Sequence, residues 1–366
     1  MALDWSHLHF GGHASKKGRV ELAHSRDLGF DLLTALAIGD QDGSTLAPLC
    51  LQMRAAGGTY STRADAPRKT ASQLDALAPV MAHVESLELG KPTVFIIDRE
   101  ADSVGHYRDW DAAGREFLVR ADDQRRVQSA QREQRLDQVA DGLRRGHGLQ
   151  LARLVRFKNQ PAEQFVGETP VVLHRPARTH RLDRRSGKKR HRNVPGPPLP
   201  LRLIVSEVRT ERGRVARWLL LTNLPASVPA ETVALWYYWR WRIESYHKLL
   251  KGVGQQVESW LQETPEALFR RLLVAAMSAV VVWRLARDDS PQAAAMRDTL
   301  VRLSGRQMKT GRAFTEPALL AGLGVLVAML DYLREHSLSD LRRLARTALG
   351  GLLDPPSPDG PAGDDG

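Results

Sequence analysis

Cysteine is almost absent from this chain of 366 residues, since Cys50 is the only one. A single thiol cannot form an intramolecular disulfide, and a zinc site made of several thiolates is excluded as well. Long apolar runs are also scarce: the longest that we identify, Leu272 to Trp283, is broken by Ser278. It falls short of the roughly 20 residues that cross a bilayer, so we expect no membrane span.

Two further signals are missing. The first residues contain neither the basic region nor the apolar region of a secretion signal. The sequence also has no Gly-rich phosphate loop ending in Lys-Ser/Thr, so it gives no support for nucleotide hydrolysis. His7, His9 and His13 match no zinc spacing, so we interpret them as ordinary strand or loop histidines. We expect a cytoplasmic, nucleoid-associated protein.

Positive charge, by contrast, is abundant. The chain has 53 Lys and Arg against 42 Asp and Glu, a net charge of +11, and a pI of about 10.1. This excess favours a polyanionic partner, with nucleic acid first. The 42% hydrophobic and 26% charged residues are ordinary for a globular protein and exclude a collagen, a coiled-coil rod or a wholly disordered chain.

The hydrophobic pattern of the first part alternates between strands and helices. We predict strands at 3–10, 30–38, 45–53, 93–97 and 117–120, a helix over 70–89 and another ending near Trp110. The fold class that this predicts is α/β. The short run 93–97 is almost wholly apolar and β-branched, which indicates a strand buried on both faces.

The middle part is different in character. Strand-like runs at 149–157, 170–174, 201–208 and 215–222 predict a mostly β insertion. The stretch 175–192 within it is rich in Arg and Lys. A solvated flexible loop and a loop that follows DNA phosphates both fit this stretch.

The last part is mainly helical, with helices expected at 229–251, at 265–287 and between 291 and 353. The final residues, 354–366, are rich in Pro, Gly and Asp, and we expect disorder there. The predicted division is therefore a catalytic domain at 1–145, a β-rich insertion at 146–226, closing helices at 227–290, a C-terminal helical region at 291–353 and a disordered tail at 354–366.

The segment 237–251 gives the strongest local signal. On one continuous helix Arg240, Glu244, Lys248 and Lys251 share a polar stripe that Trp241 borders, and Trp241 could stack on a base. The alternative is a solvated face with ion pairs at i,i+4 spacing. On this helix Arg242 falls on the apolar side, where a cation needs a partner or must extend to solvent.

Three carboxylates complete the candidate site. Asp98 follows the buried strand 93–97, Asp4 lies in the first strand, and Glu244 lies in the helix. Acids at strand ends are candidate metal ligands, and three of them could hold two Mg²⁺ ions that assist a phosphodiester displacement. The alternative for Asp98 is a cap on the following helix.

These residues resemble those of a known family, the bacterial insertion-sequence DDE transposases that carry a Tyr-x2-Arg-x3-Glu-x6-Lys signature. The matching residues are Tyr237, Arg240, Glu244 and Lys251, with the segments 98–102, 117–120 and 218–222, and Asp4 in an Asp-x-Ser-x-Leu context. The resemblance implies a ribonuclease-H-like catalytic domain interrupted by a β insertion and followed by a helical dimerisation region.

The resemblance also implies the chemistry. Asp4, Asp98 and Glu244 would be catalytic and bind two Mg²⁺, for which Mn²⁺ can substitute. One strand at the element end would be nicked, its 3′-hydroxyl would attack the opposite strand to form a hairpin, and transfer into target DNA would follow. The implied DNA-binding residues are Arg120, Trp218, Tyr237, Arg240, Trp241, Lys248 and Lys251. The implied partners are double-stranded DNA and a second copy of the chain.

One departure from the family leaves alternatives open. The family has a DNA-binding domain before its first Asp, whereas only three residues precede Asp4 here, so we expect that domain to be lacking. The alternative to an active transposase is a truncated, inactive DNA-binding relic or inhibitor of transposition. A nuclease with the same fold and no preference for element ends is a further alternative.

Overall fold

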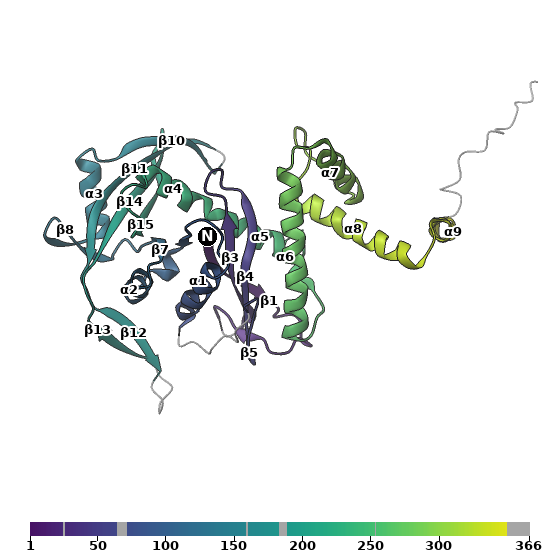
Figure 1. The fold of residues 1–366 in the computed structure, drawn as a ribbon, viewed down its shortest axis with the longest axis horizontal. Helices are drawn as coiled ribbons and strands as arrows, with labels where there is room; N and C mark the ends of the chain where they lie inside the picture. Colours follow the sequence, from purple (N-terminus) through teal and green to yellow (C-terminus); the bar gives the residue numbers. More distant parts are fainter. Residues whose placement is uncertain (25, 64–71, 159, 183–188, 253, 350–366) are drawn as a thin grey trace, which may run out of the picture. The chain divides into compact units, whose positions relative to one another are not determined.

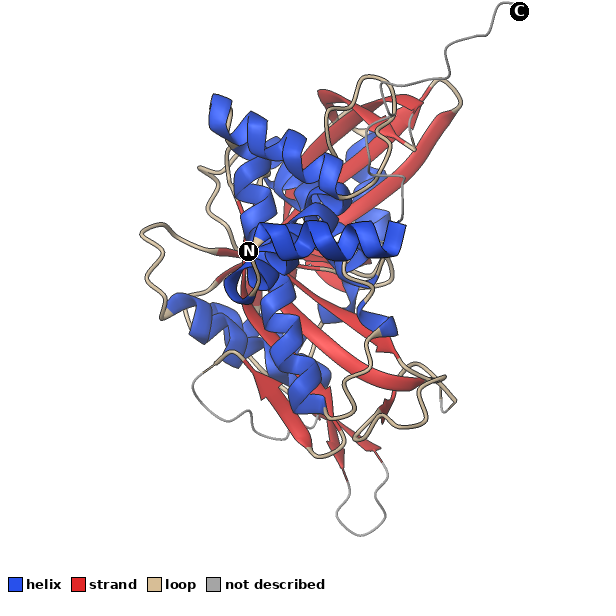
Figure 2. Cartoon of the chain, turned by 90° about the vertical axis from the view of Figure 1, so that its right-hand side faces the viewer, coloured by secondary structure: helices blue, strands red, loops and turns tan. Residues whose placement is uncertain are grey.

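The computed structural model describes residues 1–366 except 25, 64–71, 159, 183–188, 253 and 350–366. The chain forms two compact units, Met1–Arg284 and Leu285–Gly366, which we describe separately. The larger unit is a mixed α/β structure, with helices lying against the strands of a large sheet (Figures 1 and 2).

The larger unit contains a sheet of 13 strands in the order β5-β4-β3-β1-β6-β7-β15-β14-β11-β8-β9, with β2 on β3 and β10 on β11. The strands of this sheet are β1 (Ala2–His9), β2 (Val20–Glu21), β3 (Leu28–Ile38), β4 (Thr45–Ala55), β5 (Gly58–Ser61), β6 (Val94–Ile97), β7 (Glu116–Arg120), β8 (Arg126–Ser129), β9 (Arg132–Arg135), β10 (Gln150–Phe157), β11 (Gln160–Leu173), β14 (Leu199–Thr210) and β15 (Gly213–Thr222).

The first part of this sheet confirms the predicted strands. β3 and β4 form the predicted hairpin, β1 pairs antiparallel with β3 along all its residues, and β6 and β7 continue the sheet in parallel. The parallel strands are almost wholly buried because helices cover both of their faces. On one face α1 (Leu77–Glu85), α2 (Val104–Ala112) and α3 (Leu136–Arg145) contribute to the main apolar core.

The β-rich middle part continues the same sheet. β15 pairs antiparallel with β7, and β14 and β11 follow it, so these strands extend the core sheet. β11 is much longer than the predicted run 170–174. The flexible-loop interpretation of 175–192 is wrong for most of that stretch, because β12 (Ala177–Leu182) and β13 (Lys189–Val194) form a two-stranded antiparallel hairpin, the β12–β13 arm. Its tip, 183–188, lies outside the described residues.

The predicted helix over 229–251 is two helices, α4 (Ala230–Trp239) and α5 (Trp241–Lys251). At the junction the backbone N–H of Arg240 donates to Tyr237 and that of Ile243 donates to Arg240, which is the tighter three-residue spacing. Within α5, Ile243, Tyr246, Leu249 and Leu250 are buried as predicted. Arg242 is exposed, with its Nε donating to the carbonyl of Gly43 at 3.1 Å, so the prediction that it falls on the apolar side is wrong.

The remaining helix of the larger unit, α6 (Pro265–Arg287), begins and ends as predicted. The smaller unit contains α7 (Pro291–Leu303), α8 (Glu316–Glu335) and α9 (Leu338–Leu349). Gly322 lets α8 approach α7 closely, since a Cβ there would lie 1.9 Å from the carbonyl oxygen of Leu300. The predicted disordered tail, 354–366, lies outside the described residues.

Helix α8 is longer and more apolar than the sequence pattern predicted for this region. It has 20 residues, and its most apolar window has a mean hydropathy of 1.5 with 22% of that window buried, so by length and composition it could cross a membrane. The prediction overlooked it because glycines interrupt its large apolar side chains, although no polar residue lies between Pro317 and Leu330. A helix that packs against protein meets the same criteria.

Candidate active site

Asp4, Asp98 and Arg120 come from three neighbouring strands of the sheet. Leu3 pairs with Ile97, and Ile97 pairs with Val119, in the parallel pairs β1–β6 and β6–β7. The three residues that follow these in the chain are Asp4, Asp98 and Arg120. Because side chains alternate between the faces of a sheet, these three share the face opposite to the main apolar core.

Helices α4 and α5 cover this face. Tyr237 of α4 packs on Ile96, Leu118 and Leu220 of the sheet in a second apolar cluster, and Trp218 of β15 packs against it. The half-buried Trp218 lies two residues before Leu220, which pairs with Arg120. The residues expected to bind DNA at Arg120, Trp218 and Tyr237 therefore lie on the same face as the carboxylates.

Arg240 joins two of the predicted catalytic carboxylates. Its Nη1 lies 3.1 Å from Oδ2 of Asp4, and its Nη2 lies 2.8 Å from Oε1 of Glu244. The Arg240 side chain is 6% exposed, against 14% for Asp4 and 28% for Glu244. The junction between α4 and α5 thus directs a buried guanidinium group at the row of acids.

The third carboxylate, Asp98, has a structural role of its own. It is the N-cap of the short 3-10 helix η2 (Arg99–Ala101), and its Oδ1 accepts the backbone N–H of Glu100 at 2.8 Å. The alternative interpretation of Asp98 as a cap is confirmed. Capping uses one carboxylate oxygen, and so it leaves the second oxygen for another ligand.

Burial and neighbouring charges act on two carboxyl groups here, Asp4 and Glu100. Burial raises the pKa of Asp4 to about 6, and the charges of Asp98 and Glu244 add to this, although Arg240 opposes the shift. Burial and the charge of Asp98 also raise the pKa of Glu100. A cation bound beside Asp4 and Glu100 would offset both the burial and the neighbouring negative charge, because it favours the charged form of each carboxylate.

The donor chemistry of Asp4, Asp98 and Glu244 fits a hard divalent ion such as Mg²⁺, which prefers carboxylate oxygens. Their arrangement does not form a complete metal-coordination site. Among the residues that the structure describes, no group of three or more His, Cys, Asp or Glu side chains is placed to hold a metal ion. The reason is visible in the ion pairs, because Arg240 lies between Asp4 and Glu244.

The other predicted DNA-binding residues differ in exposure. Trp241 is 48% exposed and Lys248 is exposed, whereas Tyr237 is only 4% exposed. Burial raises the pKa of the Tyr237 phenol, and the charges of Arg240 and Arg120 oppose that rise. The Nζ of Lys251 donates to the carbonyl of His7 at 3.2 Å, which ties the end of α5 to β1.

Sequence reasoning missed two polar groups beside the site. Nδ1 of His7 lies 2.6 Å from Oδ1 of Asp31, which also pairs with Arg54. The signal was an aspartate within the apolar run 30–38, and the antiparallel pair β1–β3 places it directly opposite His7. The second group is His247 of α5, whose Nε2 lies 3.2 Å from Oγ1 of Thr34.

The comparisons with known proteins agree with this description. The family model for the transposase DDE domain matches residues 43–281, which is well over half of the chain. The chain therefore belongs to the transposase DDE domain family. The match includes every predicted site residue except Asp4, which precedes it.

A search of solved structures finds a cryo-EM structure of a piggyBac transposase synaptic complex with hairpin DNA. The TM-score is 0.42 at 9% sequence identity, and the alignment covers 98% of this chain and 58% of that chain. This chain thus spans 58% of the length of the piggyBac chain. Among curated proteins, none matches the sequence.

Proposed function

We propose that this chain is a DNA transposase that hydrolyses phosphodiester bonds and transfers strands at the ends of an insertion sequence, with divalent metal ions. Membership of the transposase DDE domain family supports the class of reaction. The observation that carries the proposal is the neighbouring position of Asp4 and Asp98 in the sheet, with Glu244 brought to them through Arg240. These acids are far apart in sequence, and nothing except the fold brings them together.

The strand order supports a ribonuclease-H-like core. Three antiparallel strands, β4, β3 and β1, are followed by the parallel strands β6 and β7, and the acids lie on the central pair. In this proposal the β-rich segment 146–226 is an insertion whose strands extend that core. It supplies Trp218, a flat side chain on which an unstacked base can lie.

Asp4, Asp98 and Glu244 would hold the metal ions, in practice Mg²⁺ or Mn²⁺ and two per site. When bound, such ions stabilise the charge on the attacking and leaving oxygens of a phosphodiester displacement. Arg240 contacts one oxygen of Asp4 and one of Glu244, and a cation bound between these two acids would displace it from at least one of them. The released guanidinium group would then be free to donate to a DNA phosphate, the role that the resemblance implies for it.

The DNA would be held beside the carboxylates by five side chains: Arg120, Tyr237, Trp241, Lys248 and Lys251. Cations and hydroxyl groups at such a site position the phosphate backbone and do not read its sequence.

A second copy of the chain is the proposed partner in a synaptic complex. Helix α8 offers it an apolar surface, with Val325, Val327, Met329 and Leu330 exposed. Acting on chromosomal DNA, the protein would work in the cytoplasm with the nucleoid.

The proposal is tested with a pre-nicked duplex that carries the element end and with Mg²⁺ or Mn²⁺. Wild type should form the hairpin, and Glu244→Gln should lose it while binding the same DNA equally well. Exposed Glu266, which pairs with Arg270 on α6, provides the matched control Glu266→Gln. Equal cleavage by wild type and Glu244→Gln would show that Glu244 is not catalytic.

One observation favours the second candidate, an inactive DNA-binding relic or inhibitor. Arg240 already pairs with two of the three carboxylates, as in a permanent structural ion pair. Electron paramagnetic resonance of added Mn²⁺ separates the candidates without any knowledge of the element ends. Binding of Mn²⁺ that is lost in Asp98→Asn supports the enzyme, and DNA binding with no protein-bound Mn²⁺ supports the relic.

A further inference from the structure

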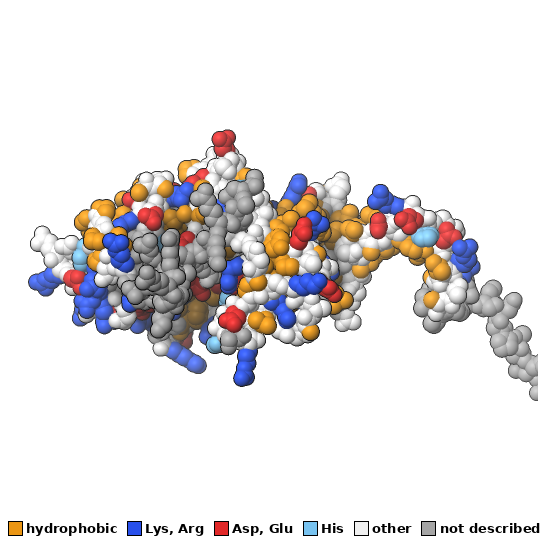
Figure 3. Space-filling model, turned by 90° about the horizontal axis from the view of Figure 1, so that it is seen from below, with side chains coloured by type: hydrophobic (Ala, Val, Ile, Leu, Met, Phe, Trp, Pro, Cys, Tyr) orange, Lys and Arg blue, Asp and Glu red, His pale blue; other side chains and the backbone are white. Residues whose placement is uncertain are grey.

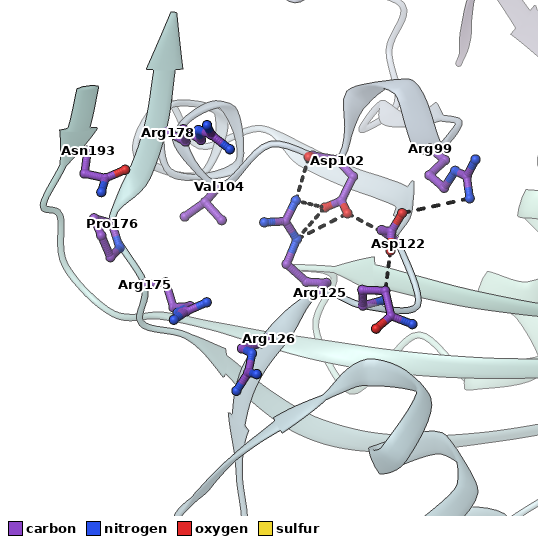
Figure 4. A pocket seen from close by; sticks show the side chains of 11 residues that line it. Arg99, Asp102, Val104, Asp122, Arg125, Arg126, Arg175, Pro176, Arg178 and Asn193 are labelled. Atoms are coloured by element: carbon purple, nitrogen blue, oxygen red, sulfur yellow. Dashed lines mark hydrogen bonds and ion pairs between the residues drawn. The ribbon is translucent and has the colours of Figure 1, made fainter. Parts of the chain in front are cut away.

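A pocket of about 700 Å³ lies where the loops after β6 and β7 meet the base of the β12–β13 arm (Figure 4). We call it the arginine pocket. Five of the residues that line it are arginines, and they come from three separate parts of the chain: Arg99, Arg125, Arg126, Arg175 and Arg178. In Figure 3, Lys and Arg side chains gather on the end of the larger unit that holds β8, β12 and β13.

The floor of the arginine pocket is rigid. Asp102 has a side chain only 4% exposed, and its carboxylate pairs with Arg125 at 3.0 Å. It also accepts the hydroxyl of Tyr107 at 2.9 Å and the backbone N–H of Asp122 at 2.8 Å. The negative charge of Asp102 is therefore compensated within the protein, and its carboxylate holds the guanidinium group of Arg125 in the wall of the pocket.

The other arginines are weakly neutralised. Arg99 is 3.9 Å from Asp122 with a side chain 60% exposed, and Arg175 is 3.9 Å from Glu133 with a side chain 54% exposed. Glu133 also forms an ion pair with Arg126 at 2.9 Å. No acidic partner of the exposed Arg178 is found among the described residues. Five guanidinium groups thus face three nearby carboxylates, which leaves a net positive pocket.

The chemistry of the lining selects the ligand. Guanidinium groups donate in a planar fork that matches a phosphate, and they do so best where the site is partly desolvated. Among the described residues that line the pocket, none is aromatic, so it has no platform on which a base could stack. Contacts of this kind fix the position of a nucleic-acid backbone.

The place of the pocket connects it to the carboxylates. Arg99 directly follows Asp98 in the chain, and Asp122 comes two residues after Arg120. Arg178 lies at the start of the β12–β13 arm, where the register places it opposite Asn193, which also lines the pocket.

We propose that the arginine pocket binds backbone phosphates of the DNA duplex whose scissile bond lies at Asp4, Asp98 and Glu244. The inference rests on the proposed function and adds to it a second DNA-holding site, separate from α4 and α5. Phosphates held there keep the duplex in line with the carboxylates, and sequence recognition is not required.

The test uses the full chain and a fluorescent duplex of about 30 base pairs without metal, with binding measured by anisotropy at several salt concentrations. Removing one cation that neutralises a phosphate reduces the slope of log K against log[salt] by about 0.9. The double variant Arg175→Gln/Arg178→Gln should therefore lower the slope by about 1 to 2. Its affinity near 0.1 M salt should fall about tenfold or more. The matched control is Arg144→Gln/Arg145→Gln, which removes two exposed charges from the last turn of α3.

The charge-retaining variant Arg175→Lys/Arg178→Lys should recover most of the slope, and circular dichroism of all variants should match wild type. A wild-type slope in the glutamine variant, or an equal loss in the control, overturns the proposal and leaves the proposed function intact. Wild type that binds no DNA overturns both. Calorimetry with inorganic phosphate alone should give no saturable binding. Tight phosphate binding that is lost in the glutamine variant would instead identify the pocket as a site for a small anion and overturn the proposal.

Discussion

Arg240 and Asp4 are separated by 236 residues in the chain, and they form an ion pair of 3.1 Å between Nη1 and Oδ2 in the larger unit. The same guanidinium group pairs with Glu244 four residues along the helix. The pair joins the first strand of the sheet to the junction of α4 and α5. The geometry of the candidate site therefore depends on the charge of one buried arginine.

Replacing that arginine should destabilise the protein. Arg240→Gln leaves Asp4 buried without its cation, and we expect the free energy of unfolding to fall by about 3 kcal/mol. Added Mn²⁺ should recover part of this loss, because a metal ion would supply the missing positive charge. Chemical denaturation with and without Mn²⁺ measures both effects. Arg270→Gln, which breaks a pair exposed by 75% and 60%, should cost less than about 1 kcal/mol. Similar losses in both variants would contradict the central role of Arg240.

The two roles of Asp98 can be separated by a pair of substitutions. Asn caps a helix about as well as Asp, so Asp98→Asn should unfold like wild type while losing metal-dependent cleavage. Asp98→Ala removes the cap as well and should cost about 1 kcal/mol. Thermal unfolding and the hairpin assay, run on both variants, check this. An active Asp98→Asn would reduce Asp98 to a cap.

Gly43 fixes how the β3–β4 turn meets the end of α4. Its φ is +67°, and a Cβ there would lie 2.6 Å from the ring of Trp239. Gly43→Ala therefore strains the backbone and overpacks the contact, at a cost of about 2–3 kcal/mol. Because the Gly43 carbonyl also accepts from Arg242, cleavage should fall as well. Gly57→Ala, where a Cβ meets open space, is the control, and equal midpoints in denaturant for the two variants would refute the prediction.

His247 should make stability depend on pH. Burial lowers its pKa to about 3, and the charges of Lys251 and Arg240 act in the same direction. An unfolded histidine takes up a proton below about 6.5, whereas the folded one stays neutral down to about 3. Across this interval the unfolded chain binds more protons, so stability rises with pH and levels off above about 6.5. His247→Gln should flatten this part of the profile in denaturation experiments from about pH 4 to 8, and an unchanged slope would show that His247 does not cause it.

Much of the fold could be predicted because its signals are local. The hairpin 30–38 and 45–53, the buried strand 93–97 and helix α6 follow from the order of apolar and turn-forming residues, and all are confirmed. The break at Arg240 could not be predicted, since a single tight turn changes no residue type. The exposure of Arg242 could not be predicted either, because it depends on the β3–β4 turn, whose Gly43 carbonyl accepts from this side chain. The arm was missed because basic residues within a hairpin have the composition of a loop.

By itself, the sequence determined which groups are available: one cysteine, a surplus of arginine, and the acids and cations of the segment 237–251. It also determined the strand that ends just before Asp98, because strand formation depends on neighbouring residues. Only the tertiary structure decided that Asp4 and Asp98 are neighbours, that Arg240 lies between two acids, and that arginines from three segments line one pocket. Those relations depend on strand register and on burial, which raises the energetic cost of an unpaired charge, and neither can be read from residues taken in order.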